Sequence, residues 1–173
     1  DLELTEAIIS YFVSDIDTAV RQAIADAVKE CEFLSREIAM KLALDVDEIS
    51  LPIVTYSPIL SDEDLWTILQ TASNNIQTAI AGRPHLGMKT TSCIAENGCY
   101  SAIKACLRNE TAIIGKAAYD HILGRFGDID PIQDLMVRRP FLPEEIVSRL
   151  FDFISEEYKQ ILLERNPVAD TTS

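Results

Sequence analysis

The chain has 173 residues, 47% of them hydrophobic and 25% charged, which is enough to bury a substantial core in one domain. It has no apolar run long enough to span a membrane, and its first residues lack the basic start of a signal peptide, so we expect a cytoplasmic protein. The net charge of -13 repels phosphate backbones and acidic lipid surfaces, which disfavours nucleic acids and membranes as partners.

Helical periodicity starts close to the N-terminus. One group of apolar residues predicts an amphipathic helix ahead of the rest of the chain, and a second group follows at the i, i+3, i+4, i+7, i+8 spacing of one helical face. A third group, after a short turn, predicts another helix. The three groups are Ala7, Ile8, Tyr11 and Phe12; Val20, Ala23, Ile24, Ala27 and Val28; and Ile38, Leu42 and Ala43.

A repeat of 26 to 28 residues then runs through the chain. Its anchor is an apolar residue just before a helix start, and the positions seven residues before and eight residues after each anchor are also apolar. The anchors are Leu34, Leu60, Leu86, Ile114 and Leu142; the later column is Leu42, Ile68, Ile94, Ile122 and Leu150; the earlier one is Ala27, Ile53, Ala79, Leu107 and Leu135.

The turns inside these repeats carry helix boundary signals. Ser35 and Ser61 stand where a side-chain oxygen caps a new helix, and Pro143 fits a first helical turn. Prolines stand two residues before three of the anchors, where they end the preceding helix: Pro58, Pro84 and Pro140. Each repeat is therefore predicted to be two helices joined by a short turn.

A helix pair of this length cannot bury its apolar face alone, so successive pairs must stack. The predicted fold class is all-α, a right-handed α-solenoid of stacked antiparallel helix pairs, like HEAT or leucine-rich-variant repeats. The β-branched segment 51–56 is predicted to be helical because it occupies a helical column of the repeat.

The C-terminal part is predicted to close the stack. Residues from Ile146 to Leu163 could run as one long terminal helix, and the tail 167–173 is predicted to be disordered. The domain organisation is thus a single domain over residues 1–166, with about five helix pairs after an N-terminal helix.

Four segments of this chain resemble a bacterial family known as domain of unknown function number 2336, a HEAT-like helical family. SPILSDEDL, from Ser57 to Leu65, is the most specific of them; the others are GRPHL, LRNETAIIGKAAYDHIL and RRPFL. The resemblance covers roughly residues 20–150 and implies a helical repeat fold with no established activity. Gly87 and Gly115 stand at cap positions where that family usually has Ser.

Residues for catalysis or metal binding are few. The two histidines, His85 and His121, have no catalytic motif around them, and the paired acids stand at predicted helix junctions, where Asp acts as a cap. The cysteines lack zinc-site spacing and are predicted to be small buried thiols of the helical core: Cys31, Cys93, Cys99 and Cys106. We therefore predict no catalytic residues, no metal site and no cofactor.

The recurring polar feature is basic. Four arginines fall at the ends of the first helices of successive repeats, so stacking would align them along one edge: Arg83, Arg108, Arg138 and Arg139. They either pair with helix ends and neighbouring acids or form a groove that captures acidic groups. Two aromatic residues, Tyr56 and Trp66, either pack in the core or anchor a partner.

These features favour a non-enzymatic interaction module that binds a partner protein or peptide on the solenoid surface. The alternative is a regulatory sensor domain that binds an anionic small ligand at the arginine ladder.

Overall fold

The structure is a computed structural model that describes residues 2–15 and 17–166, and every regular element in these ranges is an α-helix. The all-α class is therefore confirmed. The helices are α1 (Leu2–Asp15), α2 (Thr18–Val28), α3 (Arg36–Ala43), α4 (Asp47–Tyr56), α5 (Asp62–Leu69), α6 (Asn74–Ala81), α7 (Met88–Asn97), α8 (Tyr100–Arg108), α9 (Lys116–Phe126), α10 (Asp130–Val137), α11 (Glu144–Phe151) and α12 (Glu156–Arg165).

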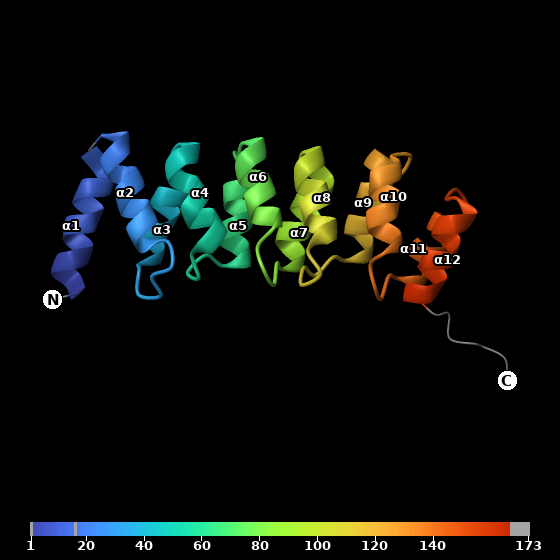
Figure 1. The fold of residues 1–173 in the computed structure, drawn as a ribbon. Helices are drawn as coiled ribbons and strands as arrows, with labels where there is room; N and C mark the ends of the chain where they lie inside the picture. Colours follow the sequence, from blue (N-terminus) through green and yellow to red (C-terminus); the bar gives the residue numbers. More distant parts are fainter. Residues whose placement is uncertain (1, 16, 167–173) are drawn as a thin grey trace.

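The helices follow one another in a row from the N-terminal to the C-terminal end (Figure 1). The even-numbered helices α2 to α12 pack each against the next, and α5, α7, α9 and α11 do the same in a second layer. Helix α1 packs against α2 and α3. None of the described helices is long and apolar enough to cross a membrane.

The repeat columns predicted from the sequence lie in the core. The later column is at most 2% exposed at every position: Leu42, Ile68, Ile94, Ile122 and Leu150. Four of the five anchors are buried and Ile114 is half-buried. The earlier column is less regular, because Ala27 is exposed while its neighbours in other repeats are buried or half-buried. The periodicity thus identifies most of the apolar spine.

Two predicted caps are confirmed. The Ser35 hydroxyl oxygen accepts from the backbone N–H of Ile38 at 3.4 Å, and that of Ser61 accepts from the N–H of Asp64 at 3.2 Å. Pro143 stands one position earlier than predicted, as the residue just before α11. The β-branched segment 51–56 lies in α4, so the repeat outweighs local propensity there.

Two expectations about helix extent and orientation were wrong. No single helix runs from Ile146 to Leu163, because residues 152–155 form a turn and Ser155 starts a new helix by accepting from the N–H of Tyr158. In α2, Ala25 is the buried residue and Val20 is exposed. The inward face is formed by Ala25 with the half-buried Arg21, Ile24 and Val28, and Arg21 pairs with Asp45 at 2.8 Å. The tail predicted to be disordered, 167–173, lies outside the described residues.

Candidate partner-binding surface

Arg83, the first arginine of the predicted ladder, is half-buried just after α6. Its guanidinium donates to the carbonyl oxygens of Val54 at 2.6 Å and Ser57 at 2.8 Å, at the end of α4 in the preceding helix pair. The last carbonyls of a helix have no partner within that helix, so Arg83 satisfies two of them. Burial lowers the pKa of Arg83 from its ordinary value.

Arg139 makes the same kind of contact two helix pairs later and is 8% exposed. Its guanidinium donates to the carbonyl oxygens of Leu107 at 3.0 Å, Asn109 at 3.0 Å and Ala112 at 3.2 Å, which follow one another at the end of α8. Its Nε donates to the Tyr119 hydroxyl oxygen at 2.8 Å. Arg139 is thus a buried tie between neighbouring helix pairs.

The other two arginines face solvent. Arg138 pairs with Asp134, one turn earlier in α10, at 2.8 Å. Arg108 is exposed at the end of α8 and has no ion pair with another described residue. The four arginines therefore do not present one continuous row of free cations, because Arg83 and Arg139 are engaged by backbone carbonyls.

Two asparagines, which were not predicted from the sequence, share the role of these arginines. Asn109 Nδ2 donates to the carbonyl oxygens of Ala81, at 3.0 Å, and Arg83, just past the end of α6. Asn166 Nδ2 donates to the carbonyl oxygen of Arg139 at 3.0 Å. The repeat spacing did not reveal them, because Arg83 and Arg139 stand three residues before their anchors, whereas Asn109 stands five residues before its own.

The family motif Ser57 to Leu65 also acts between helix pairs, and Asp64 is its fully buried member. Ser61 donates to the Asp64 carboxylate through its N–H at 3.0 Å and its hydroxyl at 2.7 Å, and Arg36, from α3, donates to both carboxylate oxygens. Burial by itself raises the pKa of Asp64, but the hydrogen bonds from Arg36 and Ser61 outweigh it and lower that pKa.

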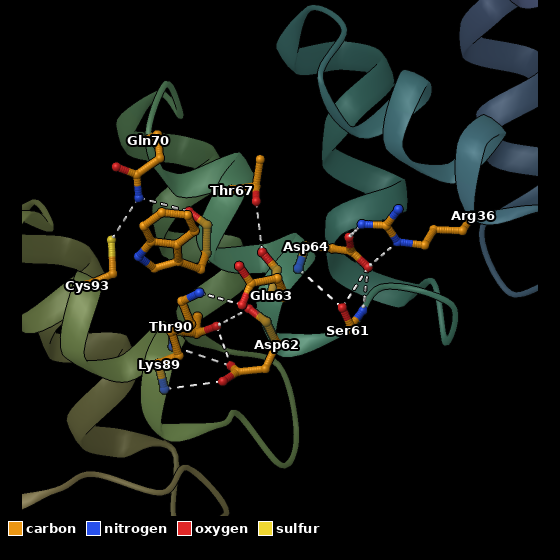
Figure 2. Close-up of polar contacts among 11 residues, drawn as sticks. Arg36, Ser61, Asp62, Glu63, Asp64, Thr67, Gln70, Lys89, Thr90 and Cys93 are labelled. Carbon is orange, nitrogen blue, oxygen red and sulfur yellow. Dashed lines mark hydrogen bonds and ion pairs between the residues drawn. The ribbon is translucent and has the colours of Figure 1, made fainter.

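Asp62 contacts the following helix pair, whereas Asp64 contacts the preceding one. Its carboxylate accepts from the backbone N–H groups of Lys89 at 3.2 Å and Thr90 at 3.3 Å, and from the Thr90 hydroxyl, so it caps α7. Figure 2 shows Arg36 reaching Asp64 on one side of the motif while Lys89 and Thr90 meet Asp62 on the other. A side chain at Gly87 would meet this cap, since its Cβ would lie 2.3 Å from Asp62 Cγ. The glycine at that cap position thus makes room for a cap from the neighbouring helix pair.

A surface groove lies between α5 and α7, directly beside this motif. Lys89 Nζ lies 4.2 Å from the centroid of the half-buried Trp66 ring and also pairs with Glu63. Gln70 Nε2 donates to Cys93 Sγ at 3.5 Å. The groove has a volume of about 510 Å³. It combines the Trp66 indole and the Met88 thioether, whose residue is 56% exposed, with one basic residue, one acidic residue and several neutral polar groups. Its lining is Trp66, Gln70, Met88, Lys89, Ser92, Cys93, Glu96 and Asn97.

Tyr56 lies in a different groove, between α2 and α4. The ring is 54% exposed, and Lys29 Nζ lies 5.3 Å from its centroid. This groove also contains Leu51 and Pro52 and has a volume of about 490 Å³. The structure therefore separates the two predicted aromatic anchors, since Trp66 belongs to the second helix layer and Tyr56 to the first.

Chemically reactive groups are dispersed. The four cysteines are free thiols, but only Cys106 is buried as predicted, and the other three are half-buried. Burial raises the pKa of Cys106 to about 11. His121 lies 3.6 Å from Glu96 on an exposed surface. Among the residues that the structure describes, no three His, Cys, Asp or Glu side chains come together in a way that could hold a metal ion.

The observed features define an all-helical protein whose neighbouring helix pairs are joined by buried polar contacts. A family model described as an uncharacterised protein conserved in bacteria (DUF2336) matches residues 49–173. The chain belongs to this bacterial family, as its motifs indicated. No curated protein and no solved structure matches the chain.

Proposed function

We propose that this chain is a non-enzymatic interaction module that binds a partner protein or peptide in the groove between α5 and α7. The observation that carries the proposal is the composition of the groove. Trp66 and Met88 supply apolar contact area, and Lys89 and Glu96 supply charge beside it. Aromatic and Met side chains are enriched at protein interfaces, and Trp is among the residues whose truncation costs the most binding free energy.

The architecture that supports this function is a right-handed α-solenoid of stacked antiparallel helix pairs, forming one domain over residues 1–166. Buried side chains from all parts of this range contribute to one apolar cluster. Repeat proteins of this kind present extended surfaces to partners. The net charge of -13 favours a protein partner over nucleic acid or an acidic membrane. A cytoplasmic location is part of the same proposal.

The engagement of Arg83 and Arg139 favours this function over the sensor alternative. Their donors contact backbone carbonyls, so an anionic small ligand would depend on Arg108 and Arg138. A thermal shift induced by inorganic pyrophosphate, and lost in an Arg108→Ala/Arg138→Ala variant, would support the sensor instead.

Affinity capture from a native bacterial lysate, followed by mass spectrometry, tests the groove directly. We expect specific partners that are retained by wild type and lost from a Met88→Gln variant. A Leu44→Gln variant is the matched control, because Leu44 is 52% exposed and lies outside the groove. Equal capture by wild type and Met88→Gln would refute the assignment to this groove.

A further inference from the structure

A second surface lies along the edge formed by the turns between the first and second helix of each pair. Figure 1 shows these five turns side by side along the lower edge of the row. The residue just before the buried anchor in each turn points outward or is half-buried, and four of the five are large and apolar. We call these residues the turn ridge: Phe33, Ile59, His85, Ile113 and Phe141.

The exposure of the turn ridge is unusual for such side chains. Phe33 is 76% exposed, Ile113 is 56% exposed and Phe141 is 93% exposed, whereas the anchor that follows each of them is buried or half-buried. Exposed apolar residues that recur at one place in a structure mark an interaction surface, because each one retains unfavourable contact with water.

The backbone holds two ridge residues outward at a cost. His85 has a φ of 56° and Phe141 a φ of 59°, the left-handed region that bulky residues rarely adopt. This conformation costs about 1–2 kcal/mol per residue. Each is preceded by Arg-Pro and followed by Leu, and the arginine holds the turn by binding carbonyls of the preceding helix pair. Strain of this kind is retained where the surrounding structure enforces it.

The turns are also hydrogen-bonded to one another. The N–H of His85 donates to the Thr111 hydroxyl oxygen at 2.9 Å, and the N–H of Ile113 donates to the Leu86 carbonyl oxygen at 2.9 Å. Arg139 continues this connection to the next turn through the Asn109 carbonyl. Hydrogen bonds therefore connect the three turns that carry His85, Ile113 and Phe141 before any partner arrives, which lowers the entropic cost of binding.

The ridge spacing indicates what kind of segment fits. Packed helices lie about 8–10 Å apart, so successive ridge residues are separated by about the same distance. A partner helix laid along the edge rises 1.5 Å per residue and covers this distance in about seven residues, which is one heptad. An extended peptide would cover the same step in about three residues but needs partners for its own backbone groups. The carbonyls at this edge already accept from Arg83, Asn109 and Arg139. A helix satisfies its own backbone and needs no such partners.

We propose that the turn ridge binds an amphipathic helix of a partner protein, whose apolar residues recur at heptad spacing and whose polar face carries both charges. The two charges match the turns themselves, where exposed Arg108 and Arg138 stand beside exposed Glu110 and Glu144. This surface is separate from the groove between α5 and α7, so the ridge and the groove can be tested independently.

The probe is a synthetic 28-residue peptide of about four heptads, with Leu at the first and fourth heptad positions and equal numbers of Lys and Glu at the others. At 1.5 Å per residue it is about 42 Å long, which matches five ridge residues about 10 Å apart. Fluorescence anisotropy with the full chain should give binding, and a peptide of identical composition with scrambled order should bind about tenfold more weakly or worse.

The ridge variant carries Phe33→Gln, Ile113→Gln and Phe141→Asn, in which Asn tolerates the left-handed backbone. The control variant carries Leu44→Gln, Leu51→Gln and Met88→Gln, which are also exposed apolar residues and include one residue of the groove. Circular dichroism confirms that both are folded. We expect the ridge variant to bind the peptide about tenfold more weakly and the control to bind as wild type does. Equal binding by the ridge variant and wild type overturns the proposal, and loss in the control alone assigns the peptide to the groove.

Two further outcomes also overturn it. The first is binding of a proline-containing, non-helical peptide as tightly as the helical one, since a helix is favoured here because it satisfies its own backbone groups. The second is cosedimentation with phosphatidylcholine vesicles that the ridge variant abolishes, which would assign the ridge to a membrane surface instead of a partner helix.

Discussion

Replacing Arg139 with Met should destabilise the protein far more than replacing its neighbour Arg138. Met has a similar length but no donors, so it leaves the carbonyl oxygens of Leu107, Asn109 and Ala112 without their charged partner. Each buried acceptor left unpaired costs about 1–3 kcal/mol. Removing a buried cation also relieves its desolvation, which offsets part of that cost. We expect a net loss of about 3 kcal/mol.

Arg138→Met is the matched control, because Arg138 is exposed and pairs only with Asp134 one turn away. Such pairs contribute about 0.3–0.5 kcal/mol. Urea unfolding followed by far-ultraviolet circular dichroism measures the free energy of unfolding, and fluorescence of the single tryptophan, Trp66, reports on the second helix pair. Arg139→Lys keeps the positive charge but not the planar set of guanidinium donors. If this variant is also destabilised, the hydrogen bonds to the three carbonyl oxygens stabilise the protein more than the charge alone does. Equal losses for Arg139→Met and Arg138→Met would refute the structural role of Arg139.

Three further predictions concern the contacts between helix pairs. Gly87→Ala should lower the free energy of unfolding, measured in urea, by about 1–2 kcal/mol, because the new Cβ displaces the Asp62 cap of α7. Gly115→Ala is the control and should change this free energy little, since its Cβ would lie 3.4 Å from its nearest neighbour, Met88 Sδ. A larger loss for Gly115→Ala than for Gly87→Ala would contradict the capping role of Asp62. Because the pKa of Asp64 is lowered, its contribution to stability is present above the ordinary value of 3.8 and is lost as pH falls through the folded-state pKa. Asp64→Asn should therefore be less stable than wild type at pH 7, and its free energy of unfolding should fall less steeply below pH 3.8. The same slope for variant and wild type in pH-dependent urea titrations would count against this role of Asp64. Cys106, with a pKa of about 11, should be the last of the four thiols alkylated by iodoacetamide at pH 8, as followed by mass spectrometry, and early labelling of Cys106 in the folded protein would show that its burial is wrong.

Much of the helical architecture could be predicted because burial imposes a period on the sequence. The column from Leu42 to Leu150 could be predicted from residue spacing alone, because each of its members is buried at the corresponding position of its own repeat. The breaks were harder to place. Ser155 starts α12 with a single hydroxyl, and local patterns around it still allow one continuous helix.

The candidate site was predictable only in part. Trp66 could be picked out because an aromatic residue one turn into a predicted helix can anchor a partner, but most of its neighbours in the groove come from α7, more than 20 residues later. Nothing in the sequence around Met88 or Cys93 indicates which residue of α5 each one faces. That information lies in the register between two helices.

The sequence by itself determined that this chain is all helical, where most of its helices lie and which residues form its apolar spine, because these properties depend on spacing within one repeat. Only the tertiary structure decided the fate of the polar residues. Arg138 and Arg139 are adjacent in the chain, yet one faces solvent and the other is buried against three carbonyls. Asp62 and Asp64 likewise bind helix pairs on opposite sides. Such differences arise from how one repeat rests on the next, and contacts across about 26 to 32 residues of chain leave no local pattern in the sequence.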